Sequence, residues 1–104
     1  MKKTILLICS GGASSGFLAQ NIRKSAKKRG LEIEVIARGE SELVEYIDRI
    51  SMVLIAPHLS YVQDDIAEQL SNTNIPHQVI DQMTYGTLNG DKGLDIIVKE
   101  LGLE

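Results

Sequence analysis

A chain of 104 residues with 43% hydrophobic and 24% charged residues has the size and composition of one globular domain. A formal net charge of -3 and the absence of Trp argue against a nucleic-acid binder, which normally needs a basic surface and aromatic platforms. A single cysteine excludes an internal disulfide, and no Cys/His cluster has zinc-site spacing, so we expect no metal, no cofactor and a reducing, cytoplasmic compartment.

The first predicted elements are a buried strand and a long helix. Thr4 to Ile8 form an apolar run that is too short for a signal peptide, and no later run approaches the length of a membrane span. We therefore expect no direct membrane insertion. Helical spacing then starts near Gly16 and stops at Gly30, a residue type that suits a helix C-terminus. The positions expected to be buried on this helix are Phe17, Leu18, Ile22 and Ala26.

The remainder of the chain alternates strand and helix patterns. Strands are predicted at 31–36, at 52–56 and after Pro76, around Val79 and Ile80. Ser60 and Gln63 have the spacing of a capping box for the third helix. The apolar faces of the later helices are predicted to be Leu43, Val44, Ile47 and Ile50; then Val62, Ile66, Ala67 and Leu70; and finally Leu94, Ile97, Val98 and Leu101. The order βαβαβαβα indicates an α/β domain with a parallel sheet.

The segment from Cys9 to Gly16 stands where the first strand gives way to the first helix. Unpaired backbone N–H groups and the helix dipole favour an anion at such a junction. Glycines let the backbone approach a bound group, and serines add hydroxyl donors. We therefore expect Cys9 to be a nucleophile for phosphorus. The predicted phosphate-binding residues are Ser10, Gly11, Gly12, Ala13, Ser14, Ser15 and Gly16. The alternative is a buried structural cysteine followed by ordinary turn residues.

Right-handed crossovers place every strand-to-helix loop at one edge of a parallel sheet, so other loops should approach Cys9. The candidate accessory residues in those loops are His58, Asp81 and Tyr85. His58 either orients the thiol or phosphate or is a plain surface residue. Asp81 is either a general acid or an acceptor for turn amides. Tyr61 and Tyr85 either present their rings to a partner protein or only pack.

One residue type is missing from the segment after the cysteine. Cysteine phosphatases with a phosphate loop follow the pattern Cys-x5-Arg-Ser/Thr, in which the arginine clamps the phosphoryl group. The sixth residue after Cys9 is Ser15, so the loop itself supplies no guanidinium. A site that holds phosphate without driving water onto it suits a carrier better than a hydrolase.

Three motifs give the chain a resemblance to a known family. They are Ile-Leu-Leu-Ile-Cys-Ser-Gly-Gly-Ala-Ser-Ser-Gly at 5–16, Leu-Ile-Ala-Pro-His-Leu-Ser-Tyr at 54–61 and Val-Ile-Asp-Gln-Met-Thr-Tyr-Gly-Thr-Leu-Asn-Gly at 79–90. Over essentially its whole length the chain resembles the enzyme IIB subunits of the lactose/cellobiose/chitobiose branch of the bacterial phosphoenolpyruvate-dependent sugar phosphotransferase system. The family often carries Ala in place of Gly11 or Gly12, and Gln in place of His58.

The resemblance implies one IIB domain over residues 1–104, a three-layer α/β/α fold with a four-stranded parallel sheet like that of low-molecular-weight tyrosine phosphatases. It implies a phosphotransferase in which Cys9 takes a phosphoryl group from a phosphohistidine of enzyme IIA and passes it to a sugar bound by the membrane enzyme IIC. The chain would then associate peripherally with the membrane through enzyme IIC, which selects the sugar. The alternatives are a low-molecular-weight cysteine phosphatase or arsenate-reductase-like enzyme, and an interaction module with a structural cysteine.

Overall fold

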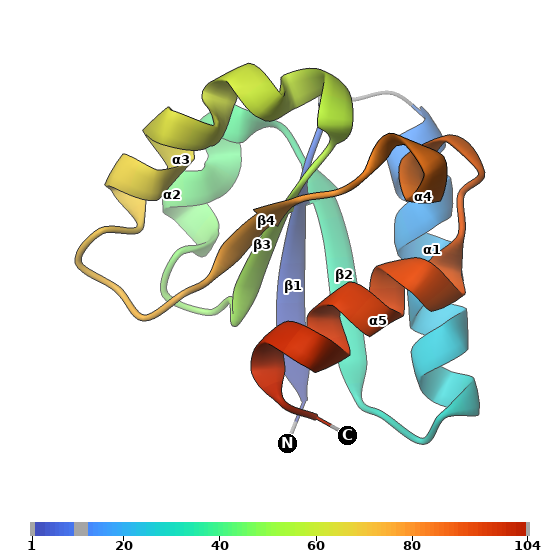
Figure 1. Ribbon diagram of the computed structural model, residues 1–104. Coiled ribbons are helices and arrows are strands. Elements are labelled where there is room, and N and C mark those ends of the chain that lie inside the picture. Colours follow the sequence, from blue (N-terminus) through green and yellow to red (C-terminus); the bar gives the residue numbers. More distant parts are fainter. Residues whose placement is uncertain (1, 10–12, 104) are drawn as a thin grey trace.

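Four parallel strands form the sheet of the computed structural model, which describes residues 2–9 and 13–103. They are β1 (Lys3–Ile8), β2 (Ile33–Arg38), β3 (Met52–Ile55) and β4 (His77–Val79), in the spatial order β2-β1-β3-β4 (Figure 1). In the register, Ile5 of β1 lies opposite Val35 of β2 on one side and Met52 of β3 on the other. The two central strands, β1 and β3, contribute side chains to a hydrophobic core on each face of the sheet, which explains their almost wholly apolar sequences.

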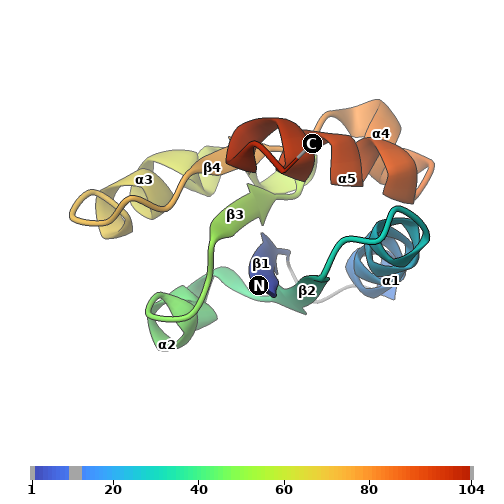
Figure 2. The ribbon, with the colours of Figure 1, turned by 90° about the horizontal axis from the view of Figure 1, so that it is seen from below.

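Helices cover both faces of the sheet and make three layers, as expected. One layer consists of α1 (Ala13–Lys28) and α5 (Gly90–Leu101). The opposite layer holds η1 (Glu40–Glu42), α2 (Leu43–Tyr46), η2 (Pro57–Val62) and α3 (Gln63–Gln69). Figure 2 looks along the molecule with the sheet between these layers. A short helix that the sequence did not indicate, α4 (Gln82–Gly86), follows the carboxyl end of β4 beside the start of α1 (Figure 1).

Each layer packs on the sheet through its own hydrophobic core. Alternate residues of β1 divide between the two cores, because successive side chains of a strand point to opposite faces. The core on the α1–α5 side includes Ile5, Leu7, Leu18, Ile22, Ala26, Leu54, Ile80, Leu94 and Ile97. The core on the α2–α3 side includes Leu6, Ile8, Leu43, Val53, Ile55, Val62, Ile66 and Leu70.

The buried stripe of α1 is the predicted one, with Leu18, Ile22 and Ala26 at intervals of four residues and 0–1% exposed. The helix ends in a Schellman motif, in which the Leu31 N–H donates to the Ala26 carbonyl (2.9 Å). Gly30 supplies the left-handed conformation, φ +73°, that this motif requires. Because the cap extends to residue 31, β2 starts at residue 33 rather than at the predicted residue 31.

Helices α1 and α5 cross at very short range, and two glycines of α5 allow it. A Cβ on Gly90 would lie 2.4 Å from the backbone carbonyl of Asn21, and one on Gly93 would lie 2.7 Å from Ile22. Asn21 also donates through Nδ2 to the Leu88 carbonyl (2.9 Å). Tight packing of these helices fixes α1 against the rest of the domain.

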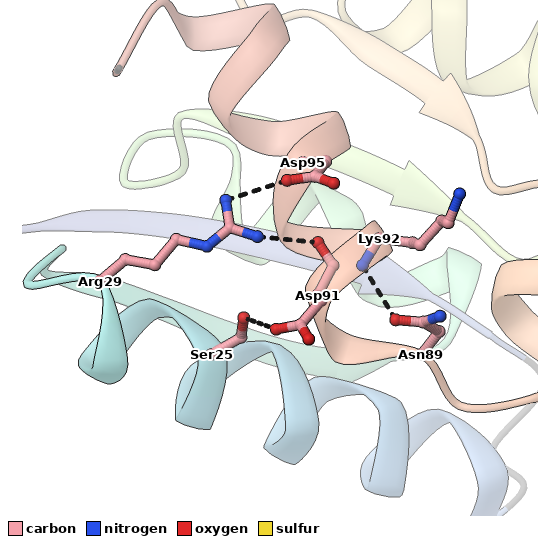
Figure 3. Close-up of polar contacts among 6 residues, drawn as sticks. All are labelled: Ser25, Arg29, Asn89, Asp91, Lys92 and Asp95. Atoms are coloured by element: carbon pink, nitrogen blue, oxygen red, sulfur yellow. Dashed lines mark hydrogen bonds and ion pairs between the residues drawn. The ribbon is translucent and has the colours of Figure 1, made fainter.

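Polar contacts surround this crossing (Figure 3). The Ser25 hydroxyl donates to the Asp91 carboxylate, and Arg29 forms an ion pair with Asp95 (2.9 Å). Asn89 caps α5 by accepting the Lys92 N–H at 3.0 Å. Both the ion pair and the cap lie at the surface, so they orient the helices more than they stabilise them.

Several predicted helix details are wrong. Phe17 and Val44 are 55% and 65% exposed rather than buried, and Ala67 is only half-buried. The capping box of Ser60 and Gln63 does not form, because η2 runs directly into α3 and the Gln63 N–H already donates to the Ser60 carbonyl. The second helix is short, with four α-helical residues after one 3-10 turn.

Candidate functional site

Cys9 follows the last residue of β1 at the carboxyl edge of the sheet, as predicted. Its backbone N–H donates to the Arg38 carbonyl (2.9 Å), which extends the pairing with β2 by one residue. Cys9 is 3% exposed, and the residue borders a cavity of about 450 Å³ together with Gly39, Leu59 and Tyr61. Cys9 is therefore shielded from bulk solvent, and the residue lies beside a cavity at the carboxyl edge of the sheet.

Helix α1 begins at Ala13, three residues earlier than the sequence pattern indicated. Ala13, Ser14, Ser15 and Gly16 therefore form its first turn, where backbone N–H groups lack partners within the helix. Gly16 lies inside a helix rather than in a loop, and a Cβ there would meet nothing within 4 Å. The expectation that Gly16 lies in the loop is wrong, because it lies in the first turn of α1; its binding of phosphate stays a prediction.

The preceding three residues of the predicted phosphate loop, Ser10, Gly11 and Gly12, lie outside the described residues. The described parts of the loop are thus its two ends, Cys9 and the first turn of α1. Between them they present a thiol and the positive end of a 16-residue helix.

The structure brings Ser15, Tyr85 and His58 together from three different strand-to-helix segments. Ser15 is 1% exposed, and its Oγ lies 2.6 Å from the phenol oxygen of Tyr85. The ring of His58 meets the Tyr85 ring edge-on, with centroids 5.5 Å apart and planes at 62°. Tyr85 therefore packs against His58 and also forms a hydrogen bond. The two tyrosines considered for contact with a partner protein, Tyr61 and Tyr85, differ in exposure. Tyr61 is the exposed one, at 77%.

Asp81 accepts turn amides, the second of the two roles considered for it. Its Oδ2 accepts the Thr84 N–H (2.9 Å) and its Oδ1 accepts the Thr84 hydroxyl (2.8 Å), so it caps α4. The Thr84 N–H, followed by the Thr84 hydroxyl, lowers the pKa of Asp81 below its usual value of 3.8. A carboxylate held in its charged form has no proton to donate at neutral pH.

Thr84 was not predicted from the sequence as part of this edge, although it is 2% exposed and holds the Asp81 cap. The signal was Asp81 itself, since Asp is favoured at helix N-caps and its side chain accepts the N–H of a residue two or three positions later. Apolar side chains are also exposed at this edge. Phe17, Tyr61 and Met83 are 55%, 77% and 74% exposed and come from α1, η2 and α4.

The arginine whose backbone contacts Cys9 uses its guanidinium for contacts away from the cysteine. Arg38, whose carbonyl pairs with Cys9, donates through Nε to the Tyr46 phenol (2.9 Å) and through Nη1 to the Ala37 carbonyl (2.7 Å). Its guanidinium also stacks over the Tyr46 ring. The cavity beside Cys9 is instead bordered by Glu40 and Glu42.

Within residues 2–9 and 13–103, no group of three or more His, Cys, Asp or Glu side chains is arranged to hold a metal ion. No helix of that part of the chain has the length and apolar character needed to cross a membrane.

Comparison with known proteins identifies relatives over nearly the whole chain. Residues 4–95 match the family model described as the PTS system, Lactose/Cellobiose specific IIB subunit. The oligo-beta-mannoside-specific EIIB component of Bacillus subtilis (strain 168) is 33% identical over 93 residues, which cover 89% of this chain and 90% of that protein. The lactose-specific EIICB component of Lacticaseibacillus casei is 28% identical over 93% of this chain but only 17% of its own length.

A solved structure agrees with these matches. The solution structure of the cellobiose-specific phosphotransferase IIB component from Borrelia burgdorferi superposes with a TM-score of 0.78 and 33% identity, covering 95% of this chain and 91% of that one. The predicted likeness to the low-molecular-weight phosphatase fold agrees with this neighbour, since IIB domains share that fold. The chain therefore belongs to the lactose/cellobiose-specific IIB subunits of the sugar phosphotransferase system.

Proposed function

We propose that this IIB component, acting as one domain over residues 1–104, is a phosphoryl carrier whose acceptor is Cys9. The observation that carries the proposal is the position of Cys9, buried at the end of β1 and bordering a cavity, just before the first turn of α1. Backbone N–H groups of that turn, together with the segment from Ser10 to Gly12, would hold the phosphoryl oxygens.

The reaction consists of two in-line displacements at phosphorus. In the first, the Cys9 thiolate attacks the phosphohistidine of enzyme IIA, so that an S–P bond forms and the N–P bond breaks with its electron pair left on the imidazole nitrogen. In the second, a hydroxyl of the sugar on enzyme IIC attacks phosphorus, an O–P bond forms, and the S–P electron pair returns to Cys9. The hydroxyl proton passes to a base or to water. Each step transfers the same phosphoryl group and consumes no water.

Transfer from enzyme IIA is what the family resemblance implies, and transfer to enzyme IIC has further support. The EIICB relative carries a region similar to this chain within a much longer protein, whose name joins IIC and IIB. A carrier that works with a membrane enzyme would associate with the membrane through that partner. The family resemblance implies that enzyme IIC, which binds the sugar, would choose it.

The rival function is a cysteine phosphatase or an arsenate-reductase-like enzyme, and the distribution of arginines counts against it. Residues 10–16 contain no arginine, and the Arg38 guanidinium is bonded to Tyr46 and Ala37. Without a bidentate clamp, attack of water on the phosphocysteine loses a charge-assisted contact worth several kcal/mol in the transition state. The phosphoprotein should persist long enough to meet its acceptor.

Intact-mass spectrometry tests the proposal directly. We expect one added phosphoryl group after incubation with phosphoenolpyruvate, the general phosphotransferase proteins and a cognate enzyme IIA, and none in Cys9→Ser. A serine hydroxyl stays protonated near neutral pH and should not accept the group, although the variant should fold. Undiminished phosphorylation of Cys9→Ser would refute the assignment. Circular dichroism of the variant is the control for folding.

A further inference from the structure

Tyr85 makes a contact that simple packing does not require. A phenylalanine would fill the same space and meet His58 in the same way, yet the Tyr85 hydroxyl reaches a side chain 70 residues away, Ser15 Oγ at 2.6 Å. Ser15 is 1% exposed, so water offers little replacement for this hydrogen bond. The bond therefore fixes the relation between the first turn of α1 and α4.

Tyr85 itself is held in place from two directions. Its backbone N–H donates to the Asp81 carbonyl (3.1 Å), inside the turn that Asp81 and Thr84 cap. His58, which follows β3 within η2, contacts its ring. The Tyr85 hydroxyl thus approaches Ser15 from a rigid base formed by two strand-to-helix segments.

The chemical role depends on which hydroxyl donates, and either atom can. Ser15 has one hydroxyl hydrogen. When Tyr85 donates, that hydrogen stays available for another acceptor, and the bond to the phenol makes Ser15 a stronger donor. When Ser15 donates, its hydrogen is used up and the bond is purely structural.

We propose that Tyr85 is a positioning residue for phosphoryl transfer at Cys9, donating to Ser15 Oγ so that the Ser15 hydroxyl donates to the phosphoryl group. This inference rests on the proposed carrier function. Ser15 stands at the sixth position after Cys9, where a phosphatase would carry its arginine, and it belongs to the first turn of α1. A neutral donor at that position stabilises the phosphoryl oxygens without the charge of a guanidinium.

Three variants test the inference: Tyr85→Phe, Ser15→Ala and the double variant. Phosphoryl transfer from phosphorylated enzyme IIA should lose about tenfold in kcat in either single variant, the worth of one hydrogen bond to a charged group. KM for enzyme IIA should not change, because docking is unaffected. The double variant should be no slower than either single variant, since both remove the same contact. The phosphorus NMR resonance of the phosphocysteine should shift in all three.

Tyr46→Phe is the matched control, because it also removes a phenol oxygen that takes part in a hydrogen bond. Tyr46 lies on α2, and its phenol oxygen accepts from Arg38 Nε at 2.9 Å. It should leave kcat and the phosphorus resonance unchanged. An unchanged kcat in Tyr85→Phe, or losses that add in the double variant, would overturn the inference while the parent protein still gained its phosphoryl group. Failure of the parent protein to gain one on Cys9 would overturn the carrier function itself.

Discussion

Gly90→Ala should destabilise the domain because it forces apart the helix pair that positions α1. The added Cβ would lie 2.4 Å from both the backbone carbon and the carbonyl oxygen of Asn21, and backbone atoms cannot turn aside as a flexible side chain can. Helix α5 must move by roughly one ångström to restore normal contact. Overpacking of this kind costs about 1–3 kcal/mol. For a domain of this size, that loss of unfolding free energy lowers Tm by roughly 5–15 °C.

Gly86→Ala provides the control for the effect of the added methyl group on the unfolded chain. Gly86 ends α4, has no left-handed φ, and a Cβ there would meet nothing within 4 Å. Replacing such a glycine reduces the entropy of the unfolded chain and should stabilise by about 0.4–1 kcal/mol. Urea unfolding followed by circular dichroism measures both variants. Equal stability of Gly90→Ala and Gly86→Ala would refute the close approach of α1 and α5.

Three further predictions concern the site and the core. The pKa of Asp81 is lowered, so its cap should stabilise the fold above the ordinary pKa of 3.8 and lose this contribution as the pH falls through the lower pKa of the folded state. Urea unfolding of Asp81→Ala should therefore show a loss of about 0.5–2 kcal/mol at neutral pH, and the difference from the parent protein should disappear in acid. Leu18→Ala should cost about 2–5 kcal/mol, whereas Phe17→Ala should stay within about 0.5 kcal/mol, and similar costs in thermal unfolding would contradict their assigned burial. The parent protein should hydrolyse an aryl phosphate negligibly, and brisk turnover with a burst at Cys9 would make it a phosphatase.

The sequence alone determined the parallel sheet, most of the core and the order of the elements apart from α4. Strand and helix periods depend only on local geometry, so the apolar run ending at Ile8 and the stripe of Leu18, Ile22 and Ala26 could be recognised without tertiary information. Placement of Cys9 at the carboxyl edge followed from the same alternation and from the handedness of crossovers. The family motifs also lay in these local patterns.

Errors arose where burial depends on what lies opposite an element. Phe17 precedes Leu18 by one residue, about 100° around the helix, and whether that flank is covered depends on neighbouring segments. Val44 likewise follows a buried residue, Leu43, and within the described part of the chain no neighbouring segment covers its side of the helix. A loop between Ile80 and Gly90 was expected, but a short helix, α4, forms there. The hydrogen bonds between Asp81 and Thr84 cap its first turn and stabilise it despite its five-residue length.

Only the tertiary structure decided which side chains meet at the site. Crossover rules bring the loops to one edge, but they do not say which residues touch, because a pairing such as Ser15 with Tyr85 depends on the positions of two helices relative to each other. Those positions follow from the strand order β2-β1-β3-β4 and from the close crossing that Gly90 permits. Contacts between residues 70 positions apart are set by packing of the whole domain, which local sequence patterns do not encode.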